Sequence, residues 1–149
     1  MELIEQILSQ GNLKEAIHRV KINKGAPGVD NKTVDELDGY FKKHQAEIKD
    51  SIMKMKYRPQ AVRRVYIPKA NGKKRPLGIP TVVDRVIQQA IAQVLMKIYD
   101  PRFSDHSYGF RPKRSAHDAI EQVLEYLDEG YQWVIDLDIE KYFDTVNHD

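Results

Sequence analysis

The sequence has 149 residues, enough for one domain with a hydrophobic core, and its 41% hydrophobic and 31% charged residues are typical of a folded globular protein rather than a disordered one. It contains no cysteine, which excludes a disulfide framework and a cysteine-ligated zinc site and is consistent with a cytoplasmic location. No apolar run approaches the roughly 20 residues of a membrane-spanning helix, and the acidic N-terminal stretch lacks the basic start of a signal peptide.

Charges are unevenly distributed along the chain. The stretch 51–83 contains nine Lys or Arg residues and no acid, whereas 118–149 contains ten Asp or Glu residues and one Lys. A basic segment favours polyanions and an acidic one favours cations or metal ions, so the sequence predicts two working surfaces. Two solvated faces of an ordinary domain are the alternative.

Apolar residues at helical spacing predict the first elements. Two short helices are expected over 3–8 and 13–20, separated by a break at Gly11 and Asn12. The segment Gly25–Asp30, GAPGVD, contains two glycines and a proline and is predicted to be a loop.

A longer helix and a hairpin are predicted next. Thr33 and Glu36 have the spacing of a capping box, which begins a helix that continues to about Lys56. The β-branched run 61–67 and the shorter run 77–79 flank an Asn-Gly pair, which predicts a two-stranded hairpin with a basic tip.

The helical pattern then returns. A long helix is expected between Thr81 and Pro101, followed by an aromatic loop over 103–113 and a helix that Ser115 caps and Gly130 ends. Together these elements predict a helix-rich α+β fold.

The segment 131–139 is predicted to be a strand that carries two acids. Alternation places Asp136 and Asp138 on one face, and the other face receives the apolar residues Trp133, Ile135, Leu137 and Ile139. Two neighbouring carboxylates are costly unless a cation meets them, and Mg²⁺ prefers oxygen ligands. Metal binding is one interpretation; solvent-facing acids, or ion pairs with Lys or Arg, are the other.

The expected hairpin is the second candidate site. Its cations Arg63, Lys69 and Arg75 flank the turn and could converge on a triphosphate, which guanidinium forks and an ammonium group neutralise well. A solvated hairpin tip is the alternative.

The last residues carry a family resemblance. The sequence DLDIEKYFDTVNHD, 136–149, resembles the first catalytic-aspartate motif of reverse transcriptases of the group II intron and retron type. The resemblance implies that Asp138 binds both catalytic Mg²⁺ ions, that the Ile139 carbonyl completes one shell, and that Phe143 is the steric gate against a ribose 2′-hydroxyl. Two metal ions suit phosphoryl transfer because they stabilise the attacking and leaving oxygens.

Two upstream blocks resemble the fingers of the same family. The first, IPKANGKKRPLGIPTVVDRVIQQA, implies that Arg63, Lys69 and Arg75 bind the incoming dNTP. The same block implies contacts near the templating base from Ile67, Pro68, Leu77 and Ile79. The second, SYGFRPKRSAHDAI, implies contacts with the template strand from Arg111, Lys113 and Arg114.

The resemblance covers the whole chain and implies its organisation. Residues 1–32 would be an N-terminal extension with GAPGVD as a lid loop, 33–130 the fingers, and 131–149 the beginning of a palm. The chain would be a fragment of a group II intron RNA-directed DNA polymerase that takes RNA template, DNA primer and dNTP, binds intron RNA and assists its splicing and mobility.

Further expectations follow from the same resemblance. The family's second metal motif, an aromatic-x-Asp-Asp hairpin, does not occur in the sequence, so this chain is expected to be inactive alone, and an unpaired edge of the last strand would favour a homodimer. The alternatives are a standalone nucleic-acid-binding module, a metal-dependent phosphohydrolase using Asp136 and Asp138, and a structural interaction domain.

Overall fold

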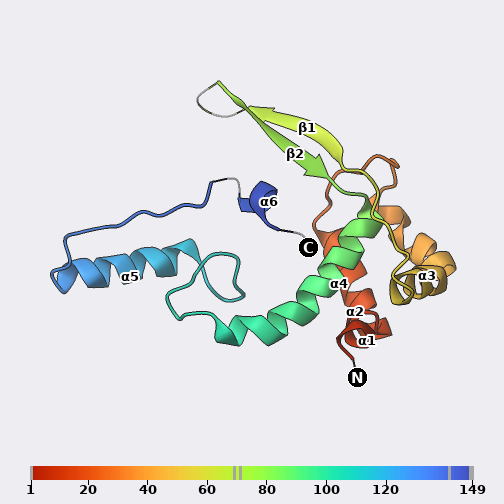
Figure 1. The fold of residues 1–149 in the computed structure, drawn as a ribbon, viewed down its shortest axis with the longest axis horizontal. Helices are drawn as coiled ribbons and strands as arrows, with labels where there is room; N and C mark the ends of the chain where they lie inside the picture. The colour runs from red at the N-terminus through yellow and green to blue at the C-terminus, as the bar shows by residue number, and fades with distance from the viewer. Residues whose placement is uncertain (1, 69, 71, 141, 148–149) are drawn as a thin grey trace. The chain divides into compact units, whose positions relative to one another are not determined.

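The computed structural model describes residues 2–68, 70, 72–140 and 142–147, apart from the side chains of Phe143 and Asp144. Its helix-rich α+β architecture confirms the predicted fold class (Figure 1). The elements in chain order are α1 (Leu3–Ile7), α2 (Gln10–Ile22), the 3-10 helix η1 (Val34–Glu36), α3 (Leu37–Met53), β1 (Arg63–Pro68), β2 (Lys74–Ile79), α4 (Val82–Tyr99), the 3-10 helix η2 (Asp100–Arg102), α5 (Ala116–Asp128) and α6 (Tyr142–Thr145).

The chain divides into two compact units, Met1–Arg102 and Phe103–Asp149. The boundaries predicted after residues 32 and 130 rest on the motifs of the family that the sequence resembles, and not on how compactly the chain packs. They therefore remain predictions.

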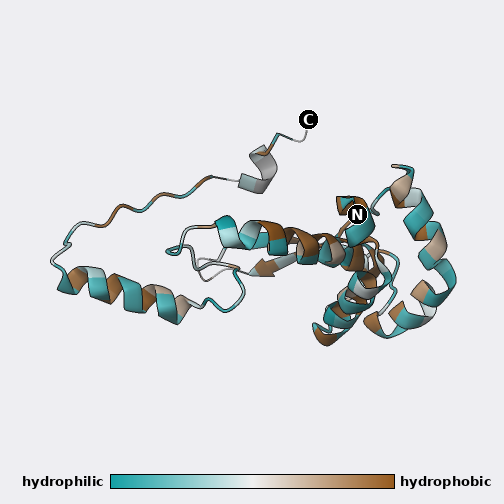
Figure 2. Cartoon of the chain, turned by 90° about the horizontal axis from the view of Figure 1, so that it is seen from below, coloured by the Kyte–Doolittle hydropathy of each residue, from teal (hydrophilic) through white to brown (hydrophobic). Residues whose placement is uncertain are grey.

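The helical core belongs to the first unit, where α4 packs against α1 and α2. Ala16 and Ala90 are fully buried, and such small side chains let helix backbones approach closely. The largest fully buried side chains are Leu37, Val82, Val86 and Thr81. Figure 2 shows the brown, apolar stretches of α4 against the neighbouring helices. This core is the platform from which the hairpin projects.

The predicted break at Gly11 and Asn12 is wrong. Both residues lie in the first turn of α2, and the chain breaks instead at Ser9, whose hydroxyl accepts a hydrogen bond from the Asn12 amide. The Asn12 side chain donates to the carbonyls of Ile7, at 2.8 Å, and Ala90, at 2.9 Å. An asparagine that suggests a turn by its residue type therefore joins α1, α2 and α4 by its amide.

The capping box at Thr33 is confirmed. The backbone amide of Thr33 donates to the Glu36 carboxylate at 2.7 Å, and its hydroxyl donates to the same oxygen at 2.9 Å. The helical path continues through η1 into α3, which ends at Met53, short of the expected Lys56.

The hairpin is confirmed, with a second strand longer than expected. Strands β1 and β2 are antiparallel, in a register that runs from Arg63 opposite Ile79 to Pro68 opposite Lys74. Cross-strand pairing extends β2 back through charged residues that have little strand preference of their own. Gly72, in the turn, has a φ of 77°, which favours glycine.

In the second unit the predicted loop and helix are confirmed, but the predicted strand is not. Ser115 caps α5, and Gly130, with a φ of 97°, follows the helix. Residues 131–139 have no regular secondary structure, and Trp133 is 94% exposed. A strand requires ladder partners, and the hairpin strands, the only ones among the described residues, pair with each other.

Helix α5 alternates apolar and polar residues along its length, seen as brown and teal bands in Figure 2. Its exposed apolar residues are Ile120, Val123, Leu124 and Leu127. As to membranes, none of the helices in the described part of the chain combines the length and apolar character that crossing a bilayer demands.

Candidate nucleotide and nucleic-acid site

The hairpin register separates its side chains into two faces. Residues directly opposite in an antiparallel pair share a face, and neighbours along a strand alternate. One face, called here the arginine face, consists of Arg63, Val65, Ile67, Arg75, Leu77 and Ile79. The other, called the tyrosine face, consists of Arg64, Tyr66, Pro68, Lys74, Pro76 and Gly78.

The arginine face brings together five of the residues predicted to contact nucleotide or templating base. Arg63 and Arg75 lie at its two ends, about 13 Å apart along the strand direction at about 3.3 Å per residue. Long guanidinium side chains can close this separation around one polyphosphate. The residues between and beside them are Ile67, Leu77 and Ile79.

Two predicted hairpin residues are not part of this arrangement. Pro68 lies on the tyrosine face, directly opposite Lys74. Lys69 lies outside the described residues. The grouping of seven hairpin residues around one nucleotide is thus reduced to five on one face.

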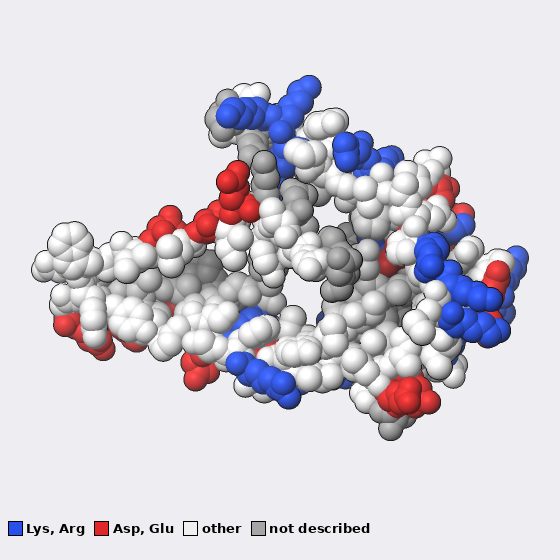
Figure 3. All heavy atoms as spheres, viewed as in Figure 1, with Lys and Arg blue, Asp and Glu red and all other residues white. Residues whose placement is uncertain are grey.

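The electrostatics of the hairpin favour an anion. Among the described residues, the buried Nε of Arg63 has no hydrogen-bond partner, and Arg75 is exposed. The segment between residues 51 and 83 contains no acid, so the hairpin itself carries only positive charge. Figure 3 shows the blue Lys and Arg side chains gathered at the tip of the hairpin, at the top of the view.

Both ends of the hairpin are attached to one buried carboxylate, Asp84, which is 3% exposed. Before β1, the Tyr57 hydroxyl donates to Asp84 Oδ1 at 2.6 Å and the Gln60 amide donates to Oδ2 at 3.2 Å. After β2, the Thr81 hydroxyl donates to Oδ2 at 2.7 Å. Asp84 therefore anchors the hairpin to the first turn of α4.

Burial, and then the hydrogen bond to Asp84, raise the pKa of Tyr57. The phenol therefore stays protonated and remains a donor throughout the neutral range.

Sequence reasoning missed Asp84. Asp84 lies three residues after Thr81, the spacing of a helix N-cap and the residue that it caps. The Asp84 backbone amide does donate a hydrogen bond to the Thr81 hydroxyl, at 3.1 Å. The bonds from Tyr57 and Gln60 cross 27 and 24 residues, and no local spacing signals them.

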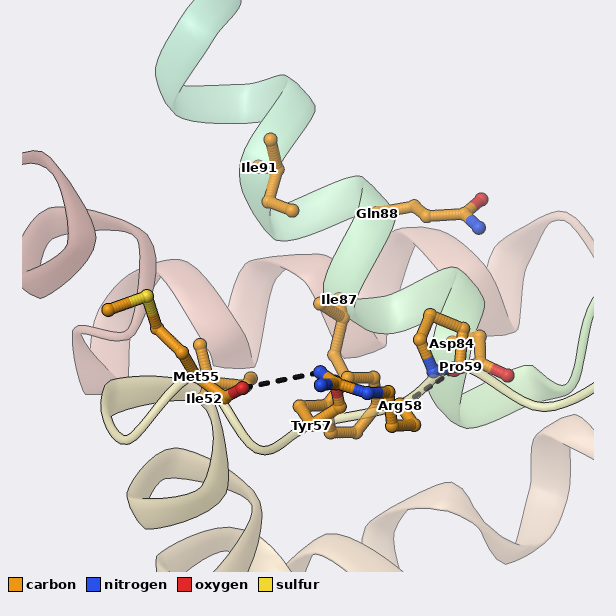
Figure 4. Close-up of a pocket in the computed structure, with 9 residues that line it drawn as sticks. All are labelled: Ile52, Met55, Tyr57, Arg58, Pro59, Asp84, Ile87, Gln88 and Ile91. Carbon is orange, nitrogen blue, oxygen red and sulfur yellow. Dashed lines mark hydrogen bonds between the residues drawn. The ribbon is translucent and has the colours of Figure 1, made fainter. Parts of the chain in front are cut away.

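A hollow of about 410 Å³ lies beside this anchor, between α4 and the segment that follows α3 (Figure 4). Arg58 lies at this hollow and donates to the carbonyls of Met55 and Tyr57 at 3.2 and 3.1 Å. The other lining residues are Ile52, Pro59, Asp84, Ile87, Gln88 and Ile91. None of the predicted site residues lines it.

The predicted lid loop, Gly25–Asp30, is fastened to the same turn of α4. A Cβ on Gly28 would lie 2.7 Å from Thr81 Cα, so the two backbones touch and only glycine fits there. The Arg85 guanidinium donates to the Ala26 carbonyl at 2.7 Å. Burial lowers the pKa of Arg85, and the charge of Asp30 partly opposes that shift.

In the second unit, two of the three predicted template-contacting cations hold their own loop. Arg111 Nη1 donates to the carbonyls of Ser104, at 2.7 Å, and Ser107, at 3.1 Å. Arg114 Nη1 donates to the Asp105 carbonyl at 2.9 Å. Lys113, by contrast, is exposed and has a left-handed φ of 60°. The loop is thus ordered by guanidinium bonds to its own backbone.

An aromatic residue that the sequence argument did not single out is presented by this loop. Phe110 is fully exposed and has a φ of 57°, a conformation that is strained for a bulky residue. Strain of this kind is typical of functional positions, and an exposed ring beside cations suits base stacking. Its aromatic residue type and its position next to Arg111, Lys113 and Arg114 are the sequence features that could have identified it as a site residue.

The candidate metal ligands do not form a complete site. Asp136 and Asp138 are exposed on the irregular segment 131–139, and Ile139 is 66% exposed. Their oxygens suit a divalent ion, but no group of three or more His, Cys, Asp or Glu residues able to hold a metal occurs in the described part of the chain. The Phe143 side chain, the predicted steric gate, lies outside the described residues.

Comparisons with known proteins point to one family. Residues 67–149 match the family described as reverse transcriptase (RNA-dependent DNA polymerase). Protein YkfC of Escherichia coli K12 is 43% identical over 142 residues, which cover 91% of this chain and 37% of YkfC. The group II intron-encoded protein LtrA of Lactococcus lactis is 44% identical over 115 residues, covering 76% of this chain and 19% of LtrA. The putative COX1/OXI3 intron 1 protein of Saccharomyces cerevisiae is 33% identical over 136 residues, covering 90% of this chain and 16% of that protein.

The chain spans 37% or less of the length of these relatives. The family match nevertheless extends over more than half of the chain and includes β2, α4, the guanidinium-ordered loop and Asp138. The chain belongs to the reverse transcriptase (RNA-dependent DNA polymerase) family, with intron-encoded proteins among its relatives.

Proposed function

We propose that this chain is the fingers and the beginning of the palm of a group II intron RNA-directed DNA polymerase. The arginine face of the hairpin would bind the triphosphate of the incoming dNTP through Arg63 and Arg75. The Lys69 ammonium group would assist them, and the templating base would lie against Ile67, Leu77 and Ile79. Pro68 lies on the tyrosine face and would contact the template from there rather than from the arginine face.

The register of the hairpin carries this proposal. It puts two guanidinium groups and three apolar residues on a single face of an acid-free segment, which matches a ligand with a polyphosphate and a flat base. The attachment of both hairpin ends to Asp84 adds support, since a nucleotide site needs side chains on a fixed base.

The chemistry of the whole protein would be nucleotidyl transfer. Membership of a polymerase family implies a divalent metal, and we infer Mg²⁺, which would stabilise the transferring phosphoryl group, with Asp138 and the Ile139 carbonyl among its ligands. Phe143 would exclude the ribose 2′-hydroxyl. Because the sequence contains no aromatic-x-Asp-Asp motif to supply further carboxylates, this chain by itself is expected to be inactive.

The remaining partners follow from the same proposal. RNA template would contact the loop of the second unit through Arg111, Lys113 and Arg114, with a DNA primer and the intron RNA as further partners. Assistance in intron splicing, a homodimer and a cytoplasmic location stay predictions.

Nucleotide binding to the chain tests the proposal. Titration calorimetry with a dNTP should show binding that Arg75→Ala weakens about tenfold, the effect of losing one hydrogen-bonded charge pair. Lys56→Ala is the matched control, because Lys56 is an exposed cation of the same acid-free stretch outside the hairpin. Equal weakening by both variants, or no nucleotide binding together with tight RNA binding, would favour a nucleic-acid-binding module.

A further inference from the structure

The tyrosine face of the hairpin has its own arrangement of side chains. Tyr66 is 59% exposed in the middle of β1, with Pro76 directly opposite on β2. Side chains directly opposite each other in an antiparallel pair lie about 5 Å apart at Cβ, so the Tyr66 ring and the Pro76 ring are neighbours and together make an apolar patch on this face.

Cations flank this patch on both sides. Arg64 precedes Tyr66 by two residues on the same face, and Lys74 lies diagonally across on β2. All three side chains are exposed, and among the described residues none forms a hydrogen bond or an ion pair with them. They are therefore available to an external ligand.

The open part of the face extends toward the hairpin tip. At the other end, a Cβ on Gly78 would lie 2.8 Å from Val62 Cγ2, so the Val62 side chain covers that position. What remains exposed is an aromatic platform with a cation on each side and no acid within the 51–83 stretch.

This arrangement selects a particular ligand chemistry. An exposed ring stacks on an unpaired base of any identity, while the flanking cations neutralise the phosphates on either side. A duplex keeps its bases stacked internally and does not offer them to the ring. A small anion would use the cations and leave the ring without a partner.

We propose that the tyrosine face binds single-stranded nucleic acid, with one base stacked on Tyr66 and neighbouring phosphates held by Arg64 and Lys74. The hairpin then has two ligands on opposite faces, a strand on this one and the nucleotide on the arginine face. The strand site is inferred from the residues of the tyrosine face alone. Only the assignment of a nucleotide to the opposite face rests on the proposed function.

Fluorescence anisotropy of the 149-residue chain with a labelled 12-nucleotide single strand tests the site. Tyr66→Ala should weaken binding about tenfold, and Tyr66→Phe, which keeps the ring, should restore it. Arg64→Ala and Lys74→Ala should each reduce the salt dependence, lowering the slope of log affinity against log salt by about 0.7. Lys56→Ala is the control for loss of an exposed cation, and thermal melts of all variants establish that they fold.

The outcomes separate this site from the nucleotide site. Weakened strand binding in Tyr66→Ala supports a strand site on this face even if the chain binds no dNTP. If the chain does bind dNTP, Tyr66→Ala should retain that binding. Wild-type strand affinity in Tyr66→Ala overturns the proposal. Loss of affinity in Tyr66→Phe equal to that in Tyr66→Ala overturns it too, because the ring would then not be the binding group. A duplex that binds as tightly as the single strand overturns the stacking mode.

Discussion

The Tyr57 hydroxyl donates a 2.6 Å hydrogen bond to Asp84 Oδ1 across 27 residues of sequence. The bond joins the segment that enters β1 to the first turn of α4, and Thr81 closes the other end of the hairpin onto the same carboxylate. A two-stranded hairpin has little stability alone. Because both of its ends are bonded to Asp84, its base is held in a fixed position on the helical core.

Replacing Tyr57 with Phe tests the anchor. The variant leaves Asp84 Oδ1 buried without its donor, which should lower the free energy of unfolding by about 1–3 kcal/mol. Urea denaturation followed by circular dichroism measures the change. Tyr66→Phe removes an equivalent hydroxyl from an exposed ring and should leave the free energy within about 0.5 kcal/mol of wild type. Equal stability of both variants would contradict the anchoring role.

Gly28 is predicted to tolerate no side chain. Gly28→Ala places a Cβ 2.7 Å from Thr81 Cα and 2.8 Å from Thr81 N, so the loop must move away from α4. We expect destabilisation of about 1–3 kcal/mol. In Gly39→Ala the added Cβ has open space within α3, and the change should stabilise the protein by about 0.5–1 kcal/mol. Thermal melts that rank the two variants in the opposite order would exclude the close contact.

The Thr33–Glu36 capping box predicts a pH dependence at the start of the helical path through η1. The Thr33 backbone amide, and then its hydroxyl, hold the pKa of Glu36 below its ordinary 4.5. A lowered folded-state pKa means that the stabilisation is complete above pH 4.5 and is lost as pH falls through the lowered value. The melting-temperature difference between wild type and Glu36→Gln should therefore be constant near neutral pH and shrink in acid.

Asp35→Asn is the matched control for this measurement. Asp35 is exposed in the same first turn, and its removal changes the charge without touching the Thr33 bonds. A difference for Asp35→Asn that follows the same pH course as that for Glu36→Gln would assign the effect to general charge at the helix start.

Arg111, which bonds the loop's own carbonyls, and Lys113, which is exposed, should respond differently to substitution. Arg111→Lys keeps the charge but loses the guanidinium group that bonds the Ser104 and Ser107 carbonyls. The lost hydrogen bonds are worth about 1 kcal/mol, so hydrogen exchange of the backbone amides across 103–115 should accelerate about fivefold. Lys113→Ala should leave exchange unchanged and reduce the salt dependence of RNA binding. Unchanged exchange in Arg111→Lys would show that these bonds do not order the loop.

Patterns among neighbouring residues correctly predicted several helices and the hairpin. The hydrophobic periodicity of 82–99, the capping box at Thr33, the Ser115 cap and the Asn-Gly hairpin need only neighbouring residues to form, and the structure contains each of them. Asn12 misled because its residue type suggests a turn, whereas its amide bonds to Ala90, 78 residues away.

Tertiary structure decided which side chains are available to ligands. Sequence alone identified Arg63, Arg75 and Arg111 as cations at candidate sites, but only the register placed the first two on one face, and only the loop fold directed Arg111 to backbone carbonyls. The segment 131–139 has the composition of a strand, yet ladder bonds come from a neighbouring strand and not from composition. Residue type and spacing therefore determined the capped helices, the hairpin and the family, while contacts between distant segments decided the hairpin's anchor at Asp84 and its two faces.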